Sequence, residues 1–237
     1  MEQQAQRKKS HAPRMISRVM MMIVLLTSFA GCKQFILFSY LLGGPPSIEP
    51  EFDKQTGKSL TDHGVVVAVV CFADNDLKYN HDSIDAYIEA GIATHLAQHQ
   101  IVTIDPQRVR SWLRENPDWD RAPEIGAGVT DAEGKHPTHV IYVDLLEYGL
   151  YEKDSANLYR GRAEATVSVF EMDPSGNGEG TRIFTDELRS QYPRLTPVAT
   201  DRVTYSAFRG NYIRRLTDEI GRFFYEYYNG DDIPEGA

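Results

Sequence analysis

The chain has 237 residues, with 34 acidic against 25 basic groups, and a formal charge of −9 at pH 7. Such an acidic surface repels phosphate backbones, so nucleic acid is excluded as an expected partner. Hydrophobic residues make up 41% and aromatic residues 11% of the chain, and this composition predicts a folded domain rather than a disordered one.

The amino-terminal segment predicts export. Five basic residues precede a largely apolar run from Val19 to Ala30, and small residues close the run before Cys32, as in a secretion signal. The stretch Phe29-Ala30-Gly31-Cys32 resembles the lipobox of bacterial lipoproteins, whose cysteine thiol is acylated and becomes the first residue of the mature chain. The resemblance implies that residues 1–32 are a signal peptide and that a lipid on Cys32 holds the protein at a membrane. Met15 is an alternative start.

A second apolar run, Phe35–Leu42, leaves open an uncleaved transmembrane anchor. In both cases the basic residues stay inside, so the remaining chain lies outside the cytoplasmic membrane, on its periplasmic face. Residues 33–63 are expected to be a membrane-proximal segment and a polar tether, punctuated by Pro and Gly. If Cys32 is acylated, the one remaining cysteine is Cys71, and its apolar neighbours predict an inert, buried thiol.

A single globular α+β domain is predicted over residues 64–229, with an acidic tail over residues 230–237. Its first strand, Val65–Phe72, is apolar without alternation, which is typical of a strand buried on both faces. A helix from about Asp82 to His99 and a short strand over Ile101–Ile104 complete a βαβ unit. A second helix begins at Asp105-Pro106, with Asp105 as its N-cap, and one more helical turn is expected over 122–128.

The second half of the domain predicts a three-stranded antiparallel meander. Residues 138–150, 162–172 and 181–188 alternate between apolar and polar side chains, and Tyr151–Gly161 joins the first two strands as a hairpin arm. A long helix over Thr204–Tyr228 follows, with an aromatic or aliphatic residue every three to four positions. Together these elements predict a mixed sheet of about five strands in an α+β fold.

Three polar residues just after the first strand are candidates for a metal or ligand site. Asp74, Asp76 and His81 offer carboxylates and an imidazole near the carboxyl end of a strand, where α/β proteins often bind ligands. They suggest a metal-dependent hydrolase or a small-ligand-binding protein as an alternative function. Turns and helix caps use the same residue types. No cofactor is expected, because the sequence has no Gly-rich phosphate loop, nucleophile elbow or HExxH motif.

Tyrosines and arginines along the predicted hairpin ends are candidates for a partner surface, because interfaces are rich in both residue types. A packed second face of the sheet is the competing interpretation of the same tyrosines. The candidates are Tyr148, Tyr151, Tyr159, Arg160, Arg162 and Tyr192.

The order of elements resembles a family of envelope proteins. Val65–Asp74, the helix over Ser83–His99, Ile101–Asp105 and His139–Asp144 look like the curli-secretion and penicillin-binding-protein-activator lipoproteins, and like the amino-terminal domain of the Tol-system propeller protein. Members bind other proteins or assemble into rings and have no catalytic residues to transfer. The resemblance therefore implies a non-catalytic accessory protein that binds another envelope protein, and we do not expect an enzyme.

Overall fold

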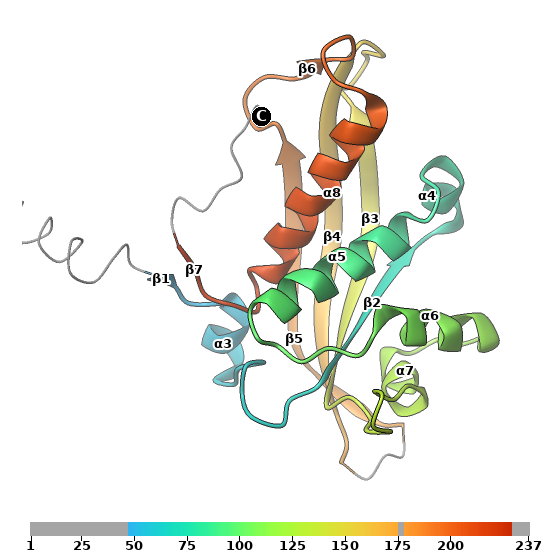
Figure 1. The fold of residues 1–237 in the computed structure, drawn as a ribbon, viewed down its shortest axis with the longest axis vertical. Helices are drawn as coiled ribbons and strands as arrows, with labels where there is room; N and C mark the ends of the chain where they lie inside the picture. Colours follow the sequence, from blue (N-terminus) through green and yellow to red (C-terminus); the bar gives the residue numbers. More distant parts are fainter. Residues whose placement is uncertain (1–46, 175–177, 229–237) are drawn as a thin grey trace, which may run out of the picture. The chain divides into compact units, whose positions relative to one another are not determined.

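The computed structural model describes residues 47–174 and 178–228, which belong to one compact unit that begins at Ser47 (Figure 1). The predicted signal peptide, Cys32 and the acidic tail over residues 230–237 lie outside the described residues. Within the described ranges, no helix is long and apolar enough to cross a membrane.

A mixed sheet forms the centre of the fold. Its long strands follow the order β2-β3-β4-β5, and the short β6 pairs with β4. β2 and β3 are parallel, whereas β3, β4 and β5 form an antiparallel meander. The strands are β2 (Val67–Ala73), β3 (His139–Tyr151), β4 (Leu158–Met172), β5 (Gly180–Tyr192) and β6 (Val198–Ala199). The predicted α+β class and five-stranded mixed sheet are thus confirmed.

The predicted strand over Ile101–Ile104 is reduced to one parallel bridge between Thr103 and Val67. The Val67 N–H donates to the Val102 carbonyl at 2.9 Å, and the Ile104 N–H donates to the Val67 carbonyl at 2.8 Å. The ladder stops there because Asp105 caps the next helix, accepting from the Gln107 N–H at 2.9 Å. The fifth strand is therefore β6 and not this segment.

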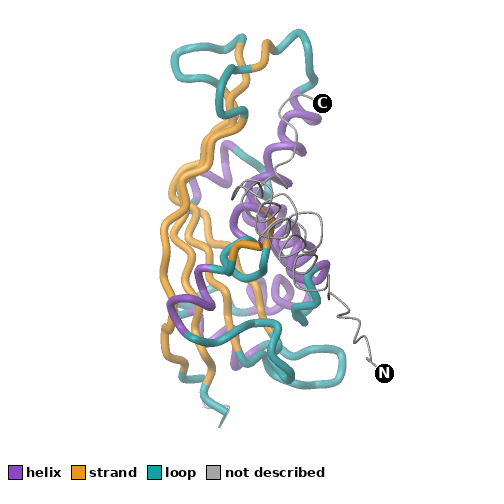
Figure 2. Tube along the Cα trace, turned by 90° about the vertical axis from the view of Figure 1, so that its left-hand side faces the viewer, coloured by secondary structure: helices purple, strands orange, loops and turns teal. Residues whose placement is uncertain are grey.

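Helices lie on both faces of the sheet. Figures 1 and 2 show α5 (Ile84–Gln98) and α8 (Tyr205–Gly221) side by side against one face. The short α6 (Pro106–Glu115) and α7 (Ala122–Gly128) pack against β2 and β3 in a separate, smaller hydrophobic core. α4 (Asn75–Asn80) links β2 to α5.

β2 contributes to both cores, which explains its unbroken apolar sequence. Val69 and Cys71 belong to the larger core with α5 and α8, whereas Ala68 and Val70 belong to the smaller core with α6 and α7. Cys71 is 5% exposed, and burial raises the pKa of its thiol well above the ordinary value. The prediction of a buried, inert cysteine therefore agrees with the structure.

The predicted tether over residues 47–63 is wrong, because this segment is part of the globular unit. The short helix α3 (Glu51–Thr56) carries Phe52, which is 0% exposed and meets the rings of Phe184 and Phe224 edge-on at 5.6 and 5.9 Å. Leu60, 1% exposed, belongs to the same core, so two apolar side chains dock this otherwise polar stretch on the fold. β1 (Ser47–Ile48) pairs with β7 (Tyr227–Tyr228) in an antiparallel ladder.

The carboxy-terminal helix ends earlier than its periodic sequence predicts. α8 stops at Gly221, and the chain turns through residues 222–224 before β7. Phe224 is fully buried beside α3, and the Tyr225 ring packs over Gly221. The tertiary contacts of these rings outweigh the helical periodicity of residues 222–228.

Candidate functional site

The three candidate metal ligands have separate structural roles. The Asp74 carboxylate caps α4, accepting from the Leu77 N–H at 2.7 Å, and Asp76 lies exposed in the first turn of the same helix. The His81 ring meets the Tyr148 ring edge-on at 4.8 Å, and burial lowers the pKa of His81. Across the described parts of the chain, no group of three or more His, Cys, Asp or Glu side chains is arranged to hold a metal ion.

The proposed tyrosine surface is mostly core. Tyr148, Tyr159 and Tyr192 are buried under α8, where Tyr148 stacks on Tyr212 at 5.6 Å and Tyr159 stacks on Phe208 at 4.9 Å. A partner surface built on these three tyrosines is therefore wrong, and the competing interpretation of a packed sheet face is correct. The spacing of the aromatic residues in α8 could have indicated this burial, because rings on one face of a helix pack against a complementary surface, here the tyrosines of the sheet.

Three candidates for the partner surface remain. Arg160 and Arg162 share one carboxylate, and Tyr151 is exposed. Glu152 pairs with Arg160 at 3.0 Å and with Arg162 at 3.2 Å, so one carboxylate holds both guanidinium groups in place and offsets one of their two charges. Tyr151 is 43% exposed and touches the Tyr159 ring at 5.2 Å. This end of the sheet thus offers a partner one exposed tyrosine.

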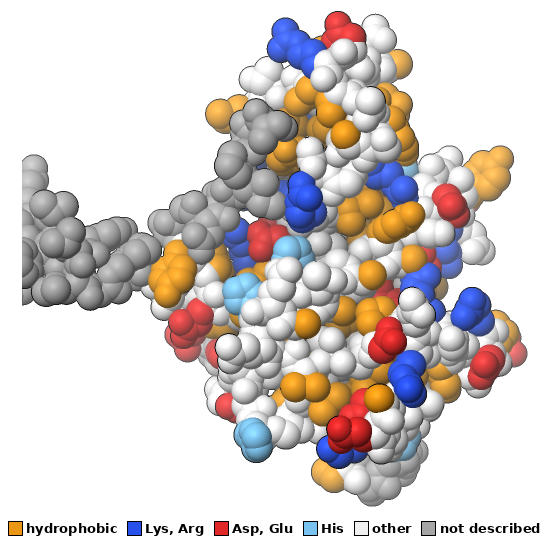
Figure 3. All heavy atoms as spheres, in the orientation of Figure 1, with side chains coloured by type: hydrophobic (Ala, Val, Ile, Leu, Met, Phe, Trp, Pro, Cys, Tyr) orange, Lys and Arg blue, Asp and Glu red, His pale blue; other side chains and the backbone are white. Residues whose placement is uncertain are grey.

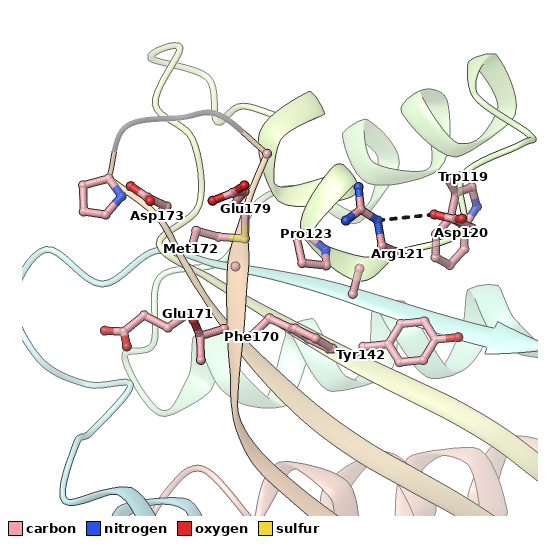
Figure 4. A pocket seen from close by; sticks show the side chains of 15 residues that line it. Trp119, Asp120, Arg121, Pro123, Tyr142, Phe170, Glu171, Met172, Asp173 and Glu179 are labelled. Carbon is pink, nitrogen blue, oxygen red and sulfur yellow. Dashed lines mark ion pairs between the residues drawn. The ribbon is translucent and has the colours of Figure 1, made fainter.

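A hollow of about 810 Å³ lies between α7 and the ends of β4 and β5 (Figure 4). Figure 4 shows the rings of Tyr142 and Phe170 on one side of it and the carboxyl groups of Asp173 and Glu179 on another. Arg121 is paired with the neighbouring Asp120 at 3.5 Å. The hollow combines scattered acidic groups with an apolar wall, and its described lining residues include no nucleophile beside a base.

A second hollow, of about 600 Å³, opens between α5 and α6 at the carboxyl end of β2. Glu89 lines it with a side chain that is 0% exposed, and burial raises the pKa of this carboxyl to about 8 against the influence of Arg110. Arg110 Nε lies 3.7 Å from Glu89 Oε1, and Arg110 also reaches Asp85 at 3.9 Å. The sequence predicted a ligand site near the carboxyl end of this strand, but it did not predict that Glu89 and Arg110 would line it. The signal was Asp85 and Glu89, one helical turn apart on an otherwise apolar helix.

A third feature is a groove of about 520 Å³ between α5 and α8, called the α5/α8 groove below. Its rim carries Tyr87 and Tyr205, which are 51% and 42% exposed, and the Arg209 guanidinium lies 4.7 Å from the centre of the Tyr87 ring. Ile213 and Arg214 complete its α8 side. None of the residues lining this groove is acidic.

The two helices approach each other closely along the groove. A Cβ at Gly91 would lie 2.6 Å from the Thr217 side chain, so only glycine fits at this point of α5. A Cβ at Gly210 would meet nothing within 4 Å, so this position of α8 faces open space. The two helices are therefore in close contact at Gly91, whereas the groove is open at Gly210.

The fold thus defines a mixed α+β protein whose described part has two helix-bordered recesses along α5. No protein-family model and no curated protein matches the sequence. Solved structures with a similar arrangement include lipoprotein GNA1162 from Neisseria meningitidis (13% identity, 66% of this chain, 97% of that chain, TM-score 0.39). They also include CT253 from Chlamydia trachomatis (14%, 68%, 97%, 0.37) and the PelC dodecamer from Paraburkholderia phytofirmans (11%, 76%, 96%, 0.37). At such TM-scores these likenesses decide nothing about activity or partners.

Proposed function

We propose that the protein is a membrane-anchored, extracytoplasmic lipoprotein with a non-catalytic role, in which it binds another protein of the cell envelope. The leader ending at Cys32 supports the address. The α5/α8 groove is the observation that carries the binding role, because it joins exposed aromatic rings, arginines and an apolar wall on one face of the molecule.

The charge of the groove supports a specific kind of partner. The chain as a whole is acidic, yet the groove is lined by Arg209 and Arg214 and has no acidic side chain. Figure 3 views this face and shows mostly hydrophobic and uncharged side chains over α5 and α8. A local basic, apolar strip on an acidic protein complements an acidic, amphipathic segment. We therefore infer that the partner inserts an acidic helix, with its apolar face toward Ile213.

Site-specific photo-crosslinking in the native envelope tests this proposal. A photoreactive phenylalanine analogue at Tyr205 is expected to capture one discrete partner, whereas the same analogue at the exposed Lys135, in the loop before β3, is not. Gly210→Leu places a side chain in open space within the groove and is expected to abolish the crosslink. Ala207→Leu is the matched control, because Ala207 is exposed on the same helix but does not line the groove.

Two outcomes would contradict the binding role. The first is a crosslink from Tyr205 that survives both Gly210→Leu and the charge reversal Arg214→Glu. The second is a partner captured from Lys135 and not from the groove. Replacing Asp74 and Asp76 by Ala distinguishes the accessory protein from the alternative of a metal-dependent hydrolase. An accessory protein is expected to keep its partner after this change.

Cys32→Ser tests the address separately from the binding role. Loss of acyl labelling and of membrane association is expected, since removing the thiol removes the attachment point of the lipid. A Cys32→Ser protein that remains integral to the membrane would point instead to the uncleaved transmembrane anchor.

A further inference from the structure

The hollow between α5 and α6, called the α5/α6 hollow below, contains a carboxyl group that its protein neighbours leave unsatisfied. Glu89 is completely buried, and within the described residues neither of its carboxyl oxygens has a hydrogen-bond partner. Its nearest cation, Arg110, lies at 3.7 Å, beyond hydrogen-bond length. A buried polar group without a partner is destabilising by about 1–3 kcal/mol, so natural proteins rarely keep one without a use.

The charges around Glu89 are unbalanced on the inner side of the hollow. Asp85 on α5 and Glu89 both face Arg110 on α6, and the thiol of Cys71 on β2 lines the same hollow. With both carboxylates ionised, one guanidinium faces two negative charges. A single additional cation that carries hydrogen-bond donors would balance the charge and satisfy the free oxygens of Glu89.

The outer side of the hollow has the opposite charge. Lys78 from α4 and Arg114 from α6 line it, and Arg114 is exposed. Beside them lies Phe72, whose ring is 40% exposed and meets the Trp119 ring edge-on at 6.4 Å. An exposed aromatic ring at the end of an otherwise buried strand provides an apolar wall next to these cations.

The location agrees with a ligand site. From β2 the chain passes through α5 on one face of the sheet to its neighbour at Thr103, and then through α6 and α7 on the other face to β3. The carboxyl end of β2 is therefore a point where the connections diverge to opposite faces, and open sheets bind ligands in the crevice at such points.

We propose that the α5/α6 hollow binds a small zwitterion of the amino-acid class, with its ammonium group on Glu89 and Asp85, its carboxylate on Lys78 and Arg114, and an apolar side chain against Phe72. This site is separate from the α5/α8 groove and does not depend on the proposed partner. It corresponds in place, but not in residues, to the ligand site predicted around Asp74, Asp76 and His81.

Three probes separate the two charges of the ligand. L-Phenylalanine has both charges, phenethylamine has only the ammonium group, and 3-phenylpropionate has only the carboxylate. Isothermal titration of the full chain in mild detergent is expected to rank phenylalanine first. Glu89→Gln should weaken phenylalanine and phenethylamine by about 10- to 100-fold and leave 3-phenylpropionate within about threefold, because a charge-assisted hydrogen bond is lost only with the ammonium probes. Arg114→Gln should weaken phenylalanine and 3-phenylpropionate and leave phenethylamine unchanged.

Proton release gives a readout that simple packing effects would not change. Because the Glu89 pKa is about 8, its carboxyl is mostly protonated at pH 7 and must ionise to hold an ammonium group. Titrations in phosphate and in Tris should therefore show about 0.9 proton released per phenylalanine at pH 7 and about 0.5 at pH 8, where the ligand's own ammonium group is still protonated, and none from Glu89→Gln.

The proposal is overturned by any of three results. One is the absence of phenylalanine binding at 10 mM, which would make Asp85, Glu89 and Arg110 a structural ion cluster only. Another is tightest binding of 3-phenylpropionate, which would indicate an anion site. The third is equal phenylalanine affinity in Glu89→Gln, once its unfolding curve shows that the variant is folded. A failed crosslink in the α5/α8 groove has no bearing on these measurements.

Discussion

The burial of Glu89 has a measurable effect on stability. Between its ordinary pKa of 4.5 and its raised value of about 8, the folded protein keeps a proton that the unfolded chain has lost. The unfolded state binds fewer protons in this window, so the free energy of unfolding falls as pH rises, by about 1.4 kcal/mol per pH unit. The loss between pH 4.5 and pH 7 is on the order of 3 kcal/mol.

Glu89→Gln removes the titrating group while keeping its shape. The variant is expected to gain stability relative to the parent protein as pH rises, by about 1.3 kcal/mol per pH unit from pH 5 to 7 and by about 1 kcal/mol from pH 7 to 8, where the carboxyl of the folded parent begins to ionise. Urea unfolding at pH 5, 6, 7 and 8, followed by the fluorescence of Trp112 and Trp119, measures the difference. Glu115→Gln, at the exposed end of α6, is the matched control and should follow the parent curve.

Parallel pH profiles for Glu89→Gln and the parent would refute the reasoning. They would mean that Glu89 stays ionised in the folded protein, with Arg110 close enough to offset its burial. A variant that is less stable at every pH would likewise show that the carboxylate is a net stabilising partner of Arg110.

Three further predictions test the fold. Phe52→Ala should destabilise the protein by about 3–5 kcal/mol in urea unfolding, whereas Gln55→Ala on the exposed side of α3 should change little. Gly161→Ala puts a Cβ 2.4 Å from an aromatic ring of α8 and should cost about 1–3 kcal/mol, unlike Gly149→Ala, where the Cβ meets nothing within 4 Å. In a chain without its other cysteine, Cys71 should resist a thiol reagent until urea unfolds the protein, and rapid labelling of the native state would contradict its burial.

Much of the fold could be predicted because local patterns and tertiary packing agree. β2 has an unbroken apolar sequence and is buried on both faces, and Asp105 caps α6 as its position before Pro106 predicts. The alternating strands give the meander. In these segments, the pattern of apolar and polar residues in each element already indicates which of its faces pack against neighbouring elements.

The prediction failed where a few distant contacts decide the structure. Two buried side chains, Phe52 and Leu60, dock a polar segment that resembles a tether, and Phe224 ends a helix whose sequence continues its periodicity. The partner surface was misplaced for the same reason. Tyr148 and Tyr159 have the composition of an interface, but the face of α8 that covers them is formed by Tyr212 and Phe208, 64 and 49 positions further along the chain. Spacing within one strand cannot reveal that contact.

The pairing of β1 with β7 joins the first and last described strands of the unit, Ser47–Ile48 and Tyr227–Tyr228. A force applied to the chain at Ser47 would first meet this two-residue ladder. The next resistance is the Phe52 ring, seated against Phe184 and Phe224. These contacts, and not the long strands of the sheet, would then be the first part of the described unit to separate under tension.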